Sequence, residues 1–180
     1  MKILVITPWF PNRPHDQHGN FILDSIEAVQ AAGHELHVLV TRPFIPAGLG
    51  TGRPDAHTRI APEMRARGMT IDVRRYPSIP GNYSRAIANR LYVHACATPA
   101  RALARHYGVD VIHAHTDMAG YVACTVRDAV GVPVVTTLHG VNTSARYWHG
   151  LGQRAFFETV CRCPERLVLV GEPLLAFAGA

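Results

Sequence analysis

The sequence has few charged side chains and almost no lysine. Charged residues make up 17% of the 180 residues, and Lys2 is the only lysine, so arginine supplies nearly all of the positive charge. An average soluble domain has about 25% charged residues. This deficit, together with 48% hydrophobic residues, excludes a disordered chain and predicts a large buried surface. The net charge of +5 comes without a block of like charges, so we expect no nucleic-acid partner.

Cysteine is scarce, and long apolar runs are absent. Cys96, Cys124, Cys161 and Cys163 are spread too thinly for a disulfide framework, so we expect reduced thiols. The apolar opening is interrupted by prolines from Pro8 onward, and no later run has the roughly 18 apolar residues that a membrane span needs. We therefore expect a cytoplasmic protein.

Two common phosphate-binding motifs are also missing. A dinucleotide site needs G-x-G-x-x-G after the first strand and an acid after the second. Here the first of these loops contains Gly19 alone, and the second predicted strand ends at Thr41 and Arg42. A P-loop needs a lysine after its glycines, whereas Lys2 precedes the first strand. A nicotinamide or flavin cofactor is therefore not expected.

What the sequence does contain is an alternation of short apolar runs with segments of helical periodicity. The runs predict strands over 3–6, 36–40, 69–73, 109–112, 132–138 and 167–170. A helix is expected from about residue 20 to Gly33, and another over 84–107 that is split or kinked at Pro99. The alternation predicts one α/β domain over 1–180, a doubly wound parallel sheet of the Rossmann-like type. Ligands of such sheets bind at the carboxyl ends of the strands.

Histidines follow two of these strands. His113 and His115 lie on one side of the fourth strand if it extends that far, and with Asp117 they form a candidate metal site. The segment resembles the H-x-H-x-D-H motif of metallo-beta-lactamase fold hydrolases, but Met118 replaces the last histidine, and an open zinc site needs three protein ligands. The alternative is a pair of histidines satisfied by hydrogen bonds. His139 ends the fifth strand, where an imidazole can face a cleft.

Two further features each allow two interpretations. Gly19 precedes the first predicted helix, where free N–H groups favour phosphate, but a glycine there can equally shape the turn. Arg90, Arg101 and Arg105 on the long predicted helix fit either a solvated face or contact with anionic lipid headgroups.

Several segments together resemble a known enzyme family. In chain order they are 2–11 (KILVITPWFP), 19–21 (GNF), 32–39 (AGHELHVL), 113–115 (HAH), 131–140 (GVPVVTTLHG) and 167–174 (LVLVGEPL). They resemble the N-terminal, acceptor-side domain of a family 4 retaining glycosyltransferase with the GT-B fold, over the whole chain. The family's E-x₇-E region lies in a second domain and has no match here. The resemblance therefore implies half of a GT-B architecture, with the C-terminal nucleotide-sugar-binding domain absent.

The resemblance also implies a reaction. A sugar would pass from a nucleotide diphosphate sugar to an acceptor hydroxyl with retention at the anomeric carbon and without a metal. The acceptor would be a glycan or lipid-linked molecule in glycan, glycolipid or cell-surface polysaccharide synthesis, and the enzyme would sit in the cytoplasm, with possible peripheral contact with the inner membrane face. The donor would bind through the missing domain, so we expect the isolated chain to be inactive. The alternatives are a metal-dependent hydrolase and a non-catalytic acceptor-binding or lipid-binding module.

The family's motifs place candidate site residues along the chain. His139 would lie beside the reacting sugar, and the H-G-x-D pattern of the family becomes H-G-V-N here. The remaining candidates are Gly19 and Asn20 in the donor-phosphate loop, Gly140 and Asn142 in the donor-sugar cleft, and His115, Thr116 and Asp117 at the acceptor wall.

Overall fold

The computed structural model describes residues 1–44, 60–78, 85–140 and 152–178. Six parallel strands form one sheet in the order β3-β2-β1-β4-β5-β6. The strands are β1 (Lys2–Thr7), β2 (Glu35–Phe44), β3 (Thr70–Pro77), β4 (Val111–His115), β5 (Val134–Leu138) and β6 (Arg166–Leu169). This order reverses between β1 and β4, so the predicted doubly wound sheet is confirmed.

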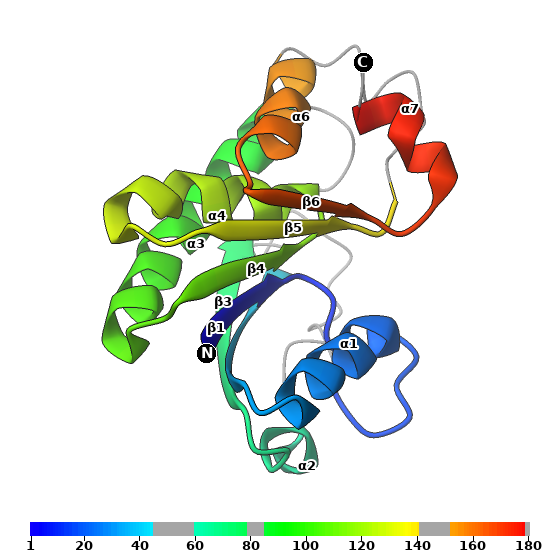
Figure 1. Ribbon diagram of the computed structural model, residues 1–180, viewed down its shortest axis with the longest axis vertical. Coiled ribbons are helices and arrows are strands. Elements are labelled where there is room, and N and C mark those ends of the chain that lie inside the picture. The colour runs from blue at the N-terminus through cyan, green and yellow to red at the C-terminus, as the bar shows by residue number, and fades with distance from the viewer. Residues whose placement is uncertain (45–59, 79–84, 141–151, 179–180) are drawn as a thin grey trace.

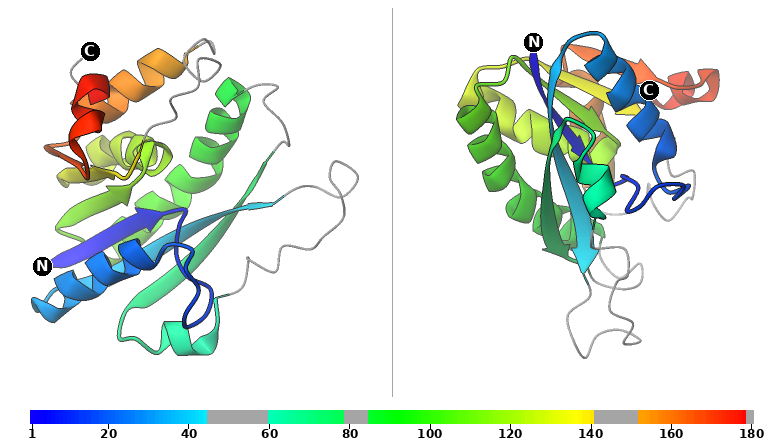
Figure 2. Two further views of the ribbon diagram at one scale, coloured as in Figure 1. Left: turned by 90° about the vertical axis from the view of Figure 1, so that its right-hand side faces the viewer. Right: turned by 90° about the horizontal axis from the view of Figure 1, so that it is seen from below.

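Helices cover both faces of the sheet. They are α1 (Asn20–Ala31), α2 (Pro62–Arg65), α3 (Arg85–Tyr107), α4 (Asp117–Val130), α6 (Gln153–Arg162), η2 (Glu172–Leu174) and α7 (Leu175–Ala178). The first two lie on one face, and α3 and α4 lie on the other (Figure 1). Figure 2 shows the same layers from two further directions, with α6 beside β6 at one end of the sheet.

The central strand β1 shows why its apolar run is unbroken. Leu4 and Ile6 are fully buried and pack with α3 and α4, while Ile3 and Val5 pack with α1 on the other face. Successive side chains of a strand point to opposite faces, so a strand with helices on both sides needs apolar residues at every position. The continuous run 3–6 therefore predicts a central position correctly.

The element boundaries depart from expectation in a few places. β4 begins two residues later than predicted and extends to His115, and β2 continues to Phe44. Pro99 does not split α3, which runs for 23 residues with this proline inside it. No helix in the described parts of the chain is both long and apolar enough to cross a membrane.

The expectation of four reduced thiols is wrong for two of them. Cys124 of α4 and Cys163, at the end of α6, form a disulfide across 39 positions of sequence, whereas Cys96 and Cys161 are free. Spacing along the chain does not indicate this pair, because only the packing of α6 on α4 brings the two sulfurs together. Such a bond is unusual in the reducing compartment that we expected.

Candidate functional site

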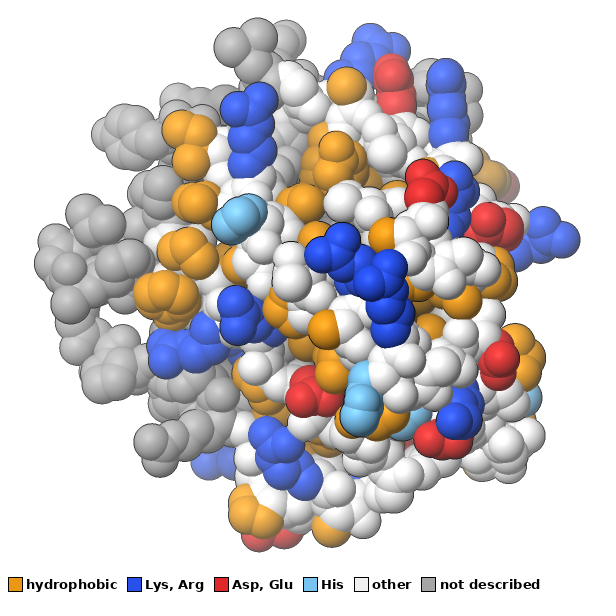
Figure 3. Space-filling model, turned by 90° about the vertical axis from the view of Figure 1, so that its left-hand side faces the viewer, with side chains coloured by type: hydrophobic (Ala, Val, Ile, Leu, Met, Phe, Trp, Pro, Cys, Tyr) orange, Lys and Arg blue, Asp and Glu red, His pale blue; other side chains and the backbone are white. Residues whose placement is uncertain are grey.

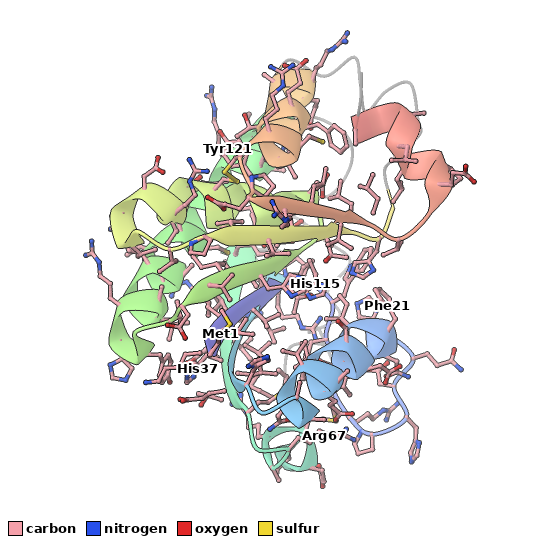
Figure 4. All side chains as sticks on the ribbon, in the orientation of Figure 1. Met1, Phe21, His37, Arg67, His115 and Tyr121 are labelled. Carbon is pink, nitrogen blue, oxygen red and sulfur yellow. A yellow bond between two sulfur atoms is a disulfide. The ribbon has the colours of Figure 1, made fainter. Side chains whose placement is uncertain are left out.

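The carboxyl ends of the strands meet the start of α1 around a groove of about 830 Å³. Figure 4 shows His115 of β4 and Phe21 of α1 close together at this edge of the sheet. The groove is lined by Trp9, Phe21, Ser25, His113, His115, Val135, Thr137, His139, Val168 and Val170. Aromatic and aliphatic walls with a few convergent polar groups are typical of small-molecule sites.

Three histidine side chains contact one another inside this groove. Nδ1 of His115 lies 2.9 Å from Nε2 of His139, and the ring centroids of His113 and His115 are 4.3 Å apart. Nε2 of His113 lies 2.9 Å from Oγ1 of Thr137. The expectation that His113 and His115 share one side of β4 is therefore confirmed. His139 uses Nε2 for its contact, which leaves Nδ1 for a partner outside this pair.

Burial keeps these histidines neutral. Burial, together with a smaller effect of the neighbouring imidazoles, lowers the pKa of His113 to about 4 and the pKa of His115 to about 2. The pKa of His139 is also lowered by burial. Near neutral pH each ring therefore carries one N–H donor and one acceptor nitrogen and no net charge.

Gly19 sits where no other residue fits. Its φ is +86°, and a Cβ atom there would lie 2.7 Å from the carbonyl carbon of Trp9. The Gly19 carbonyl accepts the N–H groups of Ile22 and Leu23 at 3.0 and 3.1 Å and so opens α1. This close approach supports the interpretation that Gly19 shapes the turn before α1. Its role toward a donor phosphate, and that of Asn20 beside it, stay predictions.

The start of α1 lies beside the histidines. The ring of Phe21, in the first turn of α1, is 4.7 Å from the ring of His139 and 5.9 Å from that of Trp9. The free N–H groups of a helix start attract anions. The geometry therefore brings an anion-favouring helix terminus and the His115–His139 pair to the same groove.

Thr116 has an unusual backbone at the end of β4. Its φ is +90° and its ψ is 162°, a conformation that a β-branched residue rarely adopts. It begins α4, where its Oγ1 accepts the N–H of Ala119 at 3.5 Å, and its own N–H donates to the carbonyl of Thr137 at 3.0 Å. Strain of this kind costs about 1–3 kcal/mol and concentrates at functional sites. The acceptor-wall role of Thr116 and Asp117 remains a prediction.

The metal-site alternative gains no support from the geometry. Among the described residues, no group of three or more histidine, cysteine, aspartate or glutamate side chains is placed to hold a metal ion. The Asp117 carboxylate accepts the N–H of Met118 at 2.8 Å, at the start of its own helix. His113 and His115 each contact a neighbouring side chain within the chain.

Of the two positions predicted to line the donor-sugar cleft, the structure describes only the first. Gly140 is exposed, and a Cβ atom there would meet nothing within 4 Å. Packing within the described chain therefore does not require a glycine at this position. Asn142 lies outside the described residues.

Sequence reasoning missed Arg42, a buried cation at the end of β2. Its guanidinium donates to the carbonyl of Pro8 at 2.8 Å, to the carbonyl of Phe10, and to Oδ1 of Asn12 at 3.1 Å. These contacts fix the loop that carries Trp9 toward the groove. The available signal was an arginine at the end of the second predicted strand, which we considered only because a dinucleotide site would need an acid there.

Comparisons with known proteins agree with this fold. Residues 18–171 match the family of glycosyl transferase 4-like domains. The putative teichuronic acid biosynthesis glycosyltransferase TuaC of Bacillus subtilis (strain 168) is 30% identical over 155 residues, which are 83% of this chain and 39% of that protein.

Solved structures share the fold at low identity. Sucrose-phosphate synthase of Thermosynechococcus elongatus aligns with a TM-score of 0.60 and 13% identity over 98% of this chain and 45% of that one. MurG of Acinetobacter baumannii aligns with a TM-score of 0.55 and 12% identity over 93% and 40%. The chain thus spans about two fifths of these relatives. The resemblance to the N-terminal domain of a family 4-like GT-B glycosyltransferase is confirmed, and because the family match covers most of its length, the chain belongs to the glycosyl transferase 4-like domain family.

Proposed function

We propose that the chain is the acceptor-side half of a retaining glycosyltransferase that moves a sugar from a nucleotide diphosphate sugar to an acceptor hydroxyl in polysaccharide synthesis. Family membership supports sugar transfer, and the name of the Bacillus relative supports a cell-surface polysaccharide. The observation that carries the proposal is the groove in which the start of α1 and the His115–His139 pair lie together.

The groove offers what the transfer of a glycosyl group requires. The leaving diphosphate gains negative charge, which the N–H groups at the start of α1 can stabilise. The sugar gains positive charge as its bond to the diphosphate breaks. A cationic imidazolium beside it would raise the energy of that state, whereas neutral His139, with its lowered pKa, does not. Gly140 and Asn142 would complete the donor-sugar cleft, and no metal takes part in the proposal.

The proposal extends to what the chain does alone. A second domain would supply most contacts with the donor nucleotide, and the acceptor would be a glycan or a lipid-linked molecule. Without that domain we expect residues 1–180 to transfer no sugar at a measurable rate. Robust transfer by these residues alone would contradict this part of the proposal.

Peripheral membrane contact through α3 is a weaker component of the proposal. On the face that carries α3 and α4, arginine side chains are interspersed with apolar, uncharged and some acidic ones (Figure 3). Arg105 also donates to the carbonyl of Ala129 at 2.8 Å, so it serves packing between α3 and α4. A sedimentation assay with vesicles that contain anionic lipid, compared with neutral vesicles, tests this contact.

The stereochemistry of the product tests the mechanism. We would incubate the protein from its complete reading frame with a panel of nucleotide diphosphate sugars and a mixture of bacterial glycan acceptors. The NMR coupling constants of the anomeric proton in the new glycoside give its configuration. The proposal expects the configuration of the donor in the product, and an inverted product would contradict retention.

A further inference from the structure

A second cavity, of about 480 Å³, lies in the helical layer on the face of the sheet opposite the histidine groove. It is lined by residues from the first halves of α3 and α4 and from most of α6, and Figure 4 shows Tyr121 of α4 beside α6. All three helices begin at the carboxyl end of the sheet. The cavity is therefore at the same edge of the molecule as the groove. Its polar lining side chains are Asn89, Arg90, His94, Tyr121, Gln153 and Thr159.

The basic side chains among the described lining residues make this cavity favourable for a negatively charged ligand. No aspartate or glutamate is among the described residues that line it, whereas Arg90 and His94, four positions apart on α3, both do. Within the described parts of the chain, Arg90 forms no hydrogen bond or ion pair, and its side chain is exposed. A guanidinium of this kind can bind a carboxylate or phosphate with two parallel hydrogen bonds.

A buried amide in the wall lacks a partner. Gln153 is only 1% exposed, and its Oε1 accepts a hydrogen bond from Nδ2 of Asn89 at 3.3 Å. Its Nε2 is buried without a partner among the described residues. A buried donor left unpaired costs about 1–3 kcal/mol, so such groups in folded proteins usually have a partner. An acceptor atom bound in the cavity would supply one.

The start of α6 also favours a negatively charged ligand in this cavity. This ten-residue helix opens at Gly152, with no side-chain cap and no acidic residue in its first turn. The backbone N–H groups of a first turn have no partner within the helix and favour negative charge. The cavity thus combines a guanidinium, an imidazole, an unpaired amide and a helix start, and every one of them can donate a hydrogen bond.

We propose that this cavity binds an oxyanion, a carboxylate or phosphate, carried by the acceptor. The inference rests on the proposed function, because it assigns to the acceptor a negatively charged group besides the hydroxyl that receives the sugar. Acidic sugars and phosphorylated carriers both present this chemistry. The cavity would hold the anionic part of the acceptor at the edge of the sheet where the histidine groove holds the reacting part.

The test is a calorimetric titration of the protein from its complete reading frame, without any nucleotide sugar. The probes are inorganic phosphate, glucuronate and, as an uncharged analogue, glucose. We expect saturable binding of phosphate or glucuronate and none of glucose. Stronger binding of phosphate would identify a phosphorylated acceptor, and stronger binding of glucuronate an acidic sugar.

Substitutions locate the binding. Arg90→Gln removes the exposed guanidinium and should weaken binding roughly tenfold, whereas Arg101→Gln, the same change elsewhere on α3, should leave the affinity unchanged. Equal losses in both variants, no loss in Arg90→Gln, or no saturable binding of either anion would overturn the proposal. Because the titration needs no sugar transfer, a failure of the proposed enzymatic function leaves its result unaffected.

Discussion

At the scale of single residues, the neutral histidines give the protein a characteristic pH response. Below the ordinary histidine pKa of about 6.5, the unfolded chain takes up protons that folded His113 and His115 do not accept. The folded state therefore loses stability as the pH falls through 6.5, and His113 contributes to this loss until about pH 4, where it is itself protonated. Each such histidine changes the free energy of unfolding by about 1.4 kcal/mol per pH unit in this window.

We predict that His113→Gln makes stability less dependent on pH. Urea unfolding of wild type and variant between pH 6.5 and 4.5 should show slopes that differ by about 1.4 kcal/mol per pH unit. His106→Gln changes an exposed histidine of α3 and is the matched control, with the wild-type slope expected. Parallel slopes for His113→Gln and wild type would mean that folded His113 takes up its proton like an unfolded histidine.

Gly19 and Gly33 allow a second test at this scale, because both have a φ near +85°. A Cβ atom at position 33 meets nothing within 4 Å, but at position 19 it meets the backbone of Trp9 and Phe10 at 2.7–2.9 Å. We expect Gly33→Ala to lower the free energy of unfolding by about 1 kcal/mol and Gly19→Ala by about 3 kcal/mol. Urea denaturation measures both, and equal losses would contradict the close approach at Gly19.

Individual site residues differ in how well the sequence predicts them. The alternation of a strand suffices to place His113 and His115 on one side of β4. It does not predict the contact between His115 and His139, because that depends on the pairing of β4 with β5 and on side-chain rotamers. The positive φ of Thr116 is likewise invisible in the sequence, since threonine does not favour it.

At the scale of elements, Arg42 links the end of β2 to the loop between β1 and α1. Removing it leaves two carbonyl groups and an amide oxygen without their donor. We predict that Arg42→Gln lowers the free energy of unfolding by about 3 kcal/mol. Arg154→Gln breaks only an exposed ion pair with Glu158 and should cost less than about 0.5 kcal/mol. Similar losses in denaturation of the two variants would show that Arg42 does not hold the loop.

The elements themselves were largely predictable. Apolar runs identify all six strands, and in the four inner strands they are explained by the helices that bury both faces of the sheet. Of the two outcomes predicted at Pro99, a split of α3 is wrong, since packing on α4 and β3 maintains a helix that local propensity alone would interrupt. Gly120 was overlooked as well: a Cβ atom there would lie 2.8 Å from Cγ2 of Thr136, so this glycine lets α4 approach the sheet closely.

At the scale of the whole molecule, the disulfide between Cys124 and Cys163 ties α4 to the end of α6. Closing a loop of 39 residues stabilises a fold by about 3–4 kcal/mol in the chain-entropy account. We predict that the double variant Cys124→Ala, Cys163→Ala loses about this amount in urea denaturation, and that a reductant lowers the stability of the wild type but not of the variant. Cys161→Ser changes a free thiol and should respond to reductant as the wild type does. A wild type that is insensitive to reductant would contradict the bond.

The global arrangement also sets the limit of prediction from sequence. The order of strands and helices indicates a doubly wound sheet and directs attention to the carboxyl ends of its strands. The cavity between α3, α4 and α6 was not predicted, because it depends on how three helices far apart in sequence pack together. The same holds for the disulfide.

The most direct test of the account is the effect of His139→Ala on sugar transfer by the protein from its complete reading frame. If His139 lies against the donor sugar, this variant should release nucleoside diphosphate on the order of 10²-fold more slowly than the wild type. It should keep its fold by circular dichroism, and His106→Ala should transfer at the wild-type rate. A His139→Ala enzyme as fast as the wild type would contradict the account.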